Sequence, residues 1–187
     1  MLSLQTDQKK TIRSLNPFFM IALFFVFLLV RTSSATVLPG FLLRWDFLLP
    51  FVIYFGQRRP LFEGLLLWFI MSHWYSLESA APIGCLVIFY LLIYLLSRIL
   101  SETVFAADSF QILTLLFSLG LLARFILPWI SHFFGAGWSV FSWRNLNPFF
   151  LISDLVLNLI TFYLLLIVDK VSAKEARPVL DLNEGII

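Results

Sequence analysis

The sequence is short of charge, of histidine and of cysteine. Only 13% of its 187 residues are charged, too few to cover a soluble globule, whereas 60% are hydrophobic and the mean hydropathy is +0.94. The single cysteine, Cys85, excludes an intrachain disulfide and a cysteine-based metal cluster. The two histidines, His73 and His132, lie far apart, which leaves a zinc site without its usual ligands. These scarcities predict an integral membrane protein with no bound metal.

Motifs for catalysis and for nucleic-acid binding are missing as well. The sequence contains no glycine-rich phosphate loop, no zinc motif and no paired-carboxylate motif. His73 follows Ser72, but no nucleophile and acid stand with it at motif spacing, which favours an interface histidine over a catalytic base. The net charge of +2 is dispersed and offers no basic stripe for nucleic acid. We therefore expect a protein that is not an enzyme and that uses no cofactor.

Six apolar segments predict an all-α fold with six transmembrane helices in one membrane domain, 1–187. The predicted spans are about 17–37, 41–55, 61–75, 82–97, 110–130 and 149–168, and the polar tails are 1–16 and 169–187. Asn16 and Pro17 have the chemistry of a helix start, and Pro50 predicts a kink in the short second span. The first span also resembles a signal peptide with small residues at 33–35, but Arg31 can reach the interface, and a retained helix is favoured.

The distribution of basic residues predicts the orientation. With the N-terminus in the cytoplasm, nine bases lie inside and three outside, in accord with the positive-inside rule. The inside bases are Lys9, Lys10, Arg13, Arg58, Arg59, Arg98, Lys170, Lys174 and Arg177; the outside bases are Arg31, Arg44 and Arg144. We expect both termini to be cytoplasmic and the chain to cross the bacterial inner membrane several times.

The strongest intramembrane candidates are Arg124 and Asp154. The fifth span is predicted to run outward and the sixth inward, so the two residues lie at similar depth and can pair. Asn158 and Thr161 follow Asp154 on the same helical face. Two interpretations stay open: a polar site at a helix junction, or a structural ion pair that holds two spans in register.

Other polar and aromatic groups have two interpretations each. Tyr90 and Tyr94 share one face of the fourth span with Ser97, where packing is favoured over ligand binding. Arg44 and Asp46 either reach the membrane interface or face other helices. Trp138 and Trp143 make the loop at 131–147 either a partner-facing surface or a lipid anchor.

One short repeat is present. The five letters LNPFF occur at 15–19 and at 146–150, each at the expected start of a span. The two spans are predicted to point in opposite directions, and Asn-Pro is a good helix start by itself. Coincidence is therefore favoured over duplication.

The stretch 45–98 resembles the MreD family of bacterial rod-shape-determining membrane proteins. The resemblance rests on the order and spacing of the following residues: Asp46, Tyr54, Arg58, Arg59, Gly64, Pro82-Ile83-Gly84, Tyr90-Leu91 and Tyr94-Leu95. The last span, followed by Asp169-Lys170-Val171, looks like the closing helix of that family. The chain departs from the family pattern at Trp68, Ser72 and Ser76, where small residues and an aspartate are expected.

The resemblance implies a non-enzymatic scaffold of the cell-elongation machinery. Such a protein is expected to bind MreC and to help couple MreB filaments in the cytoplasm to peptidoglycan synthesis by a RodA-type glycosyltransferase and its transpeptidase partner. Cell shape and peptidoglycan synthesis would then depend on helix surfaces and short loops.

Two other classes of function are weighed against the scaffold. A substrate-binding subunit of a vitamin or small-nutrient transporter would need a polar outward pocket, and Arg44, Asp46, Arg124 and Asp154 all belong to the predicted outer half. The first span lacks the small-residue stripe expected for docking in such a subunit, since Ala22 stands alone among Phe and Leu. An enzyme acting on lipid-linked precursors is disfavoured by the two histidines and the absence of an acid-rich loop.

Overall fold

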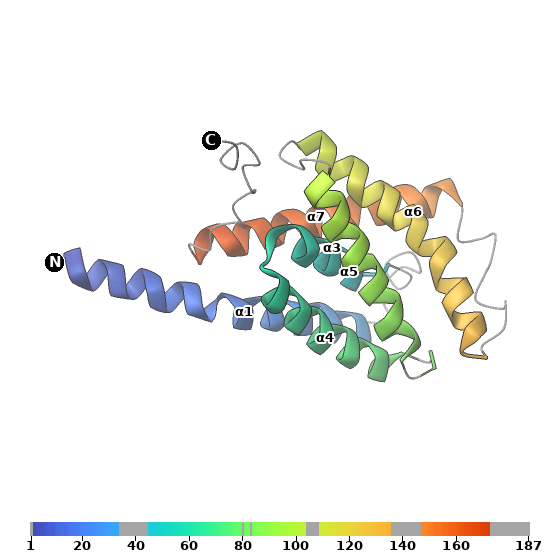
Figure 1. The fold of residues 1–187 in the computed structure, drawn as a ribbon, viewed down its shortest axis with the longest axis horizontal. Coiled ribbons are helices and arrows are strands. Elements are labelled where there is room, and N and C mark those ends of the chain that lie inside the picture. Colours follow the sequence, from blue (N-terminus) through green and yellow to red (C-terminus); the bar gives the residue numbers. More distant parts are fainter. Residues whose placement is uncertain are drawn as a thin grey trace, which may run out of the picture.

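A computed structural model of the chain describes residues 2–33, 45–79, 81–82, 84–103, 109–135 and 147–172, with side chains from 14 onward in the first helix. All regular structure in these ranges is α-helical (Figure 1). The six helices are α1 (Leu2–Ser33), α3 (Leu48–Arg58), α4 (Leu61–Glu78), α5 (Cys85–Thr103), α6 (Ser109–Phe133) and α7 (Pro148–Val171). The prediction of an all-α fold is confirmed for the described residues.

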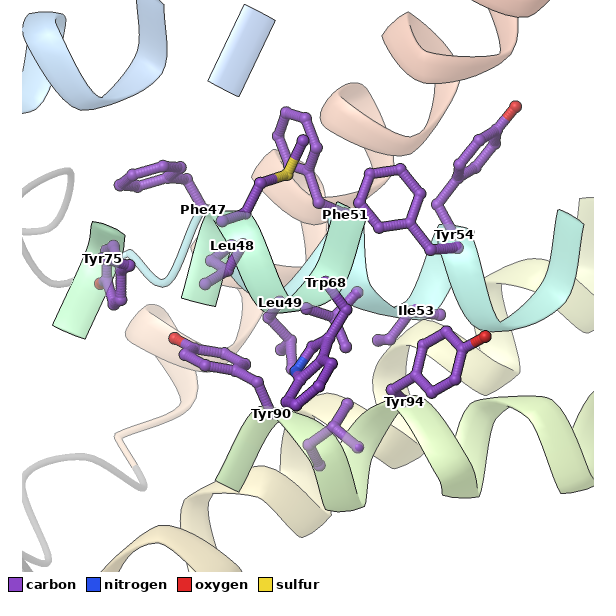
Figure 2. Packing of buried hydrophobic residues seen from close by; sticks show 14 of the residues in the cluster. Phe47, Leu48, Leu49, Phe51, Ile53, Tyr54, Trp68, Tyr75, Tyr90 and Tyr94 are labelled. Carbon is purple, nitrogen blue, oxygen red and sulfur yellow. The ribbon is translucent and has the colours of Figure 1, made fainter. Parts of the chain in front are cut away.

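Helix α3 forms the centre of the bundle. Its 11 residues span only about 16 Å, and the side chains from Phe47 to Phe55 are all buried. A helix that is apolar on every face is stable only when other elements cover all of those faces. Rings and aliphatic side chains of α4 and α5 close over α3 in Figure 2, and α7 also packs against it.

The other helices surround α3 and turn apolar side chains outward. Residues 14–33, 111–133 and 148–171 are each long and apolar enough to cross a membrane, and 85–101 of α5 form a shorter apolar helix. Large hydrophobic side chains such as Phe62 and Phe133 are more than 80% exposed. Water would solvate such a surface poorly, so the bundle is suited to a lipid bilayer.

The second predicted span is wrong in its helical bounds. The structure begins α3 at Leu48 and ends it at Arg58, whereas the sequence predicted 41–55; residues 41–44 lie outside the described part. The kink that the sequence predicts at Pro50 has no physical cause here, because Pro50 lies in the first turn of α3, where its missing amide hydrogen costs no helical hydrogen bond.

The predicted start of the first helix is also wrong. Helix α1 begins at Leu2 and contains Pro17, so Asn16 does not cap it. The first part of α1 extends beyond the other helices (Figure 1), and Asn16 is fully buried where α1 meets the bundle. Its side chain binds another helix instead of its own backbone, as described below.

Helices α3 to α7 all continue past their predicted ends, by three to six residues. Helix α5 passes Arg98 and reaches Thr103, and α7 passes 168 and reaches Val171. Asp169, in the extension of α7, accepts hydrogen bonds from Arg59 and Tyr54, and Arg98 of α5 donates to the Arg59 carbonyl. Residue Asp169, assigned to the polar tail by sequence, therefore belongs to α7.

Candidate functional site: two polar clusters at the ends of the bundle

A buried polar cluster joins α1, the end of α3 and the end of α7. We call it the Asp169 cluster; it comprises Asn16, Tyr54, Arg59, Asp169 and Ser172. The Asp169 carboxylate accepts hydrogen bonds from Arg59 Nη2, from Tyr54 OH and, at 2.9 Å, from Asn16 Nδ2. Arg59 Nη2 also donates to Asn16 Oδ1 at 2.6 Å.

Burial makes the Asp169 cluster structurally important. Arg59 is only 1% exposed, and its guanidinium lies 5.9 Å from the centre of the Tyr54 ring. A charge removed from water at that depth needs both an opposite charge and hydrogen bonds. Asp169 provides both, so three helices separated in sequence are tied at one point.

Arg59 also contacts α4 and α5. Glu63, on the first turn of α4, lies 3.4 Å from Arg59 Nη1, and Arg98 Nη1 donates to the Arg59 carbonyl at 3.2 Å. Arg59 and Glu63 thus form an i,i+4 ion pair in which the arginine side chain is buried. Arg58 is half-buried beside it. Gln57 lies one position earlier and is buried, and neither of its amide atoms has a hydrogen-bond partner among the described residues.

A second polar cluster lies at the other end of α3. We call it the Asp46 cluster; it comprises Arg31, Asp46, Tyr75 and Tyr90. Tyr90 OH donates to Asp46 Oδ1 at 2.6 Å, and Arg31 Nη1 donates to Tyr75 OH. The Tyr75 and Tyr90 rings meet edge to face at 5.9 Å, which connects the two hydrogen-bonded pairs. Asp46 therefore faces other helices, while Arg44 lies outside the described residues.

The two clusters lie at opposite ends of an apolar layer. Asn16 and Arg31 both belong to α1 and are separated by 15 residues, or about 22 Å along the helix. Between them α1 buries Met20, Phe24 and Leu28 against the core. The two polar clusters thus lie on either side of an apolar layer of α1.

The structure pairs Arg124 with Asp154, as the sequence suggested. Their side chains are 19% and 21% exposed and join α6 to α7. Asn158, one turn further along α7, accepts a hydrogen bond from Trp45 Nε1 at 2.8 Å. Thr161 bonds back to the Leu157 carbonyl. Three polar residues on one predicted face therefore have three different partners, which favours a structural ion pair over a single polar site.

Glycines permit close contacts between the helices around α3. A Cβ at Gly64 would lie 2.7 Å from Tyr94 OH, the hydroxyl that donates to the Leu61 carbonyl at 3.2 Å. A Cβ at Gly56 would lie 1.8 Å from Ser97 Oγ and 2.9 Å from the Tyr94 carbonyl. The α3–α5 and α4–α5 contacts are therefore possible only because these positions lack a side chain. Gly84 has a φ of +86°, which a glycine adopts readily in the turn that leads into α5.

The remaining predicted residues are dispersed. His73 is exposed and stacks on Phe69, with ring centroids 5.9 Å apart. Trp68 is 7% exposed and packs in the core, and its indole N–H has no acceptor in the part of the chain that the structure describes. Trp138 and Trp143 lie outside the described residues.

Sequence reasoning missed Asn16, Gly56 and Asp169. Asn16 was interpreted as a cap and Asp169 as a tail residue, because each borders an apolar run. One signal was available: Asp169 follows Leu165 by four residues and Phe162 by seven, so it continues the buried stripe of α7. Gly56 had a weaker signal, a single glycine within an apolar segment.

The chemistry of the two clusters is that of charge pairing and hydrogen bonding between helices. Among the described residues, no group of three His, Cys, Asp or Glu side chains could hold a metal ion. Comparisons of the chain with protein-family models, with curated proteins and with solved structures find no match.

Proposed function

We propose that this chain is a membrane scaffold of the bacterial cell-elongation machinery, similar to MreD. The observation that carries the proposal is that four of the residues on which the resemblance rests meet in two pairs in the structure. Asp46 bonds to Tyr90, and Gly64 packs on Tyr94, so the beginning of the stretch 45–98 is joined to its end. The spacings of these residues therefore correspond to helix contacts around one buried core. Such contacts are expected if the resemblance reflects a common arrangement of helices.

We further propose six membrane-crossing segments with both termini in the cytoplasm. Asn16 of α1 contacts Asp169 and Ser172 at the end of α7, which supports an arrangement with both chain ends on one side. Arg58, Arg59, Arg98 and Lys170 gather at this same end of the bundle, as the positive-inside rule requires of a cytoplasmic face. In this arrangement α3, although short, crosses the apolar layer at the centre, shielded from lipid by its neighbours.

The proposed partners follow from the resemblance. An MreC-type protein would bind at the outer face, and MreB filaments and the RodA-type and transpeptidase synthases would be linked through it. The loop that carries Trp138 and Trp143 is the proposed contact surface, because aromatic residues are enriched at interface centres. The protein would then act by binding partners through its helix surfaces and loops, without catalysing a reaction.

A nutrient-binding transporter subunit is the alternative that the structure bears on. A pocket of about 80 Å³ lies among Leu28, Arg31, Thr32, Tyr75, Glu78 and Ser79. Pockets for drug-sized or vitamin-sized ligands measure roughly 300–1,000 Å³. Asp46 is bonded to Tyr90, and Arg124 to Asp154, so these predicted pocket residues are used in other contacts. The scaffold is the better-supported proposal.

Depletion of the protein in its native host tests the proposal. Conversion of rods to spheres, reversed by the wild-type gene, is the expected result. Unchanged shape together with lost uptake of a small nutrient would favour the transporter. A variant with both Trp138 and Trp143 changed to Ala should accumulate normally, yet fail to capture the MreC-type partner and fail to restore shape. The matched control is Trp74→Ala, which removes an exposed tryptophan of α4 and should keep both functions.

A further inference from the structure

The pocket between α1 and α4 has an unusual charge arrangement. Arg31 and Glu78 both line it, yet no carboxylate of the described residues lies within 4.0 Å of the Arg31 guanidinium. The cation and the anion therefore face one small cavity without forming a salt bridge. A ligand with both a negative and a positive group would complete the charge pairs on its two sides.

Arg31 is held in place for such a role. Its guanidinium carbon lies 5.7 Å from the centre of the Phe47 ring and 5.2 Å from that of Tyr75. Nη1 donates to Tyr75 OH, so one of five N–H groups has a defined acceptor while the side chain remains only half-buried. A guanidinium fixed by two rings can offer its other donors to a phosphate without losing side-chain entropy.

The position of the pocket indicates where its ligand comes from. Arg31 and Thr32 end the apolar segment 14–33, and Glu78 is the last residue of α4. The exposed side chains of Leu29, Leu77 and Trp74 surround this end of the two helices. Charged groups directly beyond such apolar surface lie at the headgroup level of a bilayer, where phospholipid headgroups are the most abundant ions.

We propose that the pocket binds one phospholipid headgroup that carries a phosphate and a primary ammonium, as in phosphatidylethanolamine. The phosphate binds Arg31, and the ammonium binds the exposed carboxylate of Glu78. Thr32 and Ser79 also line the pocket, and the acyl chains follow the apolar surface of α1 and α4. The volume of about 80 Å³ accommodates a small ammonium group with its ethylene stem rather than a sugar or a vitamin. Neither the topology nor the scaffold function enters this proposal.

Native mass spectrometry of the purified full-length chain tests it. The protein is delipidated in mild detergent and titrated with phosphatidylethanolamine, phosphatidylglycerol or phosphatidylcholine of identical acyl chains. We expect one lipid molecule to be retained per protein chain. The affinity for phosphatidylethanolamine should be about fivefold higher than for the other two lipids, which is the effect expected of one partly exposed ion pair. Equal retention of all three lipids would overturn the proposal.

Variants of Glu78 assign the ammonium contact. Glu78→Gln should abolish the preference while phosphatidylglycerol binding stays unchanged, and Glu78→Asp, which keeps the charge, should retain most of it. Because Glu78 is exposed, both variants should fold, which their melting temperatures will verify. An unaltered preference in Glu78→Gln refutes the assignment. A different outcome is that phosphoethanolamine at millimolar concentration raises the melting temperature as much as phosphatidylethanolamine does. That result would show that the ligand is a soluble compound and would overturn a lipid as its source.

Discussion

Asp169→Ala tests how the bundle is held together. The change removes the only carboxylate that contacts both Arg59 Nη2 and Tyr54 OH among the described residues, and it leaves a guanidinium that is 1% exposed. Breaking a buried ion pair from one side costs about 3–5 kcal/mol. Glu63, at 3.4 Å from Nη1, compensates in part, so we expect about 3 kcal/mol, or more than a hundredfold in the unfolding equilibrium constant.

The assay is reversible unfolding in mixed micelles, followed by tryptophan fluorescence during titration with a denaturing detergent. Lys170→Ala is the control, because Lys170 is the next residue and is exposed; its effect should stay within about 0.5 kcal/mol. The double variant Arg59→Met with Asp169→Leu should recover much of the loss, because it removes both charges from the buried site. A loss below about 1 kcal/mol for Asp169→Ala, or additive losses in the double variant, would refute the reasoning.

Three further substitutions probe the contacts around α3. Gly56→Ala should destabilise the bundle by about 1–3 kcal/mol because the new Cβ overlaps α5. Gly120→Ala is the control and should be neutral or stabilising, because the nearest neighbour of its Cβ would lie at 3.9 Å. Equal effects of the two variants in the same unfolding assay would contradict this expectation. Tyr90→Phe should cost about 1–3 kcal/mol because the half-buried Asp46 loses its side-chain donor, and a melting temperature equal to wild type would argue against that bond. Asp154→Ala should lower accumulation or abolish complex assembly, and unchanged levels and co-purification would disprove a role for the ion pair.

The helices were predictable because their signals are local. Apolar runs between polar turns gave five of the six helices within a few residues at one or both ends, and 109–133 almost completely. The Arg124–Asp154 pair could also be predicted. In two adjacent antiparallel helices, residues at equal distances from the connecting loop lie at the same depth, and these two residues are nearly so placed. The pairing of Asp46 with Tyr90 and the fit of Gly64 on Tyr94 required the packing of three helices, and only the candidate residues, not their partners, could be inferred.

The Asp169 cluster could not be predicted for a physical reason. Its hydrogen bond between Asn16 and Asp169 joins residues 153 positions apart, and a single sequence contains no register for such a contact. The repeated letters LNPFF make the same point. Asn147 accepts a hydrogen bond from the Phe149 amide at 3.0 Å and caps α7, whereas Asn16 lies inside α1 and binds another helix. The same local chemistry is thus used as a cap or as a tertiary contact, depending on what packs beside it.

Trp68 stands at a position where the MreD-like pattern expects a small residue. A small residue at that position would let α4 approach its neighbours closely, but Trp68 fills the space with a buried indole whose N–H finds no acceptor among the described residues. Close approach occurs instead one turn earlier, at Gly64 against Tyr94, and at Gly56 against Ser97. A contact made by small residues and one filled by an aromatic ring can keep helices in the same order at different separations. Within the stretch 45–98, the close helix contacts therefore lie at Gly56 and Gly64, and Trp68 contributes to the core by filling volume.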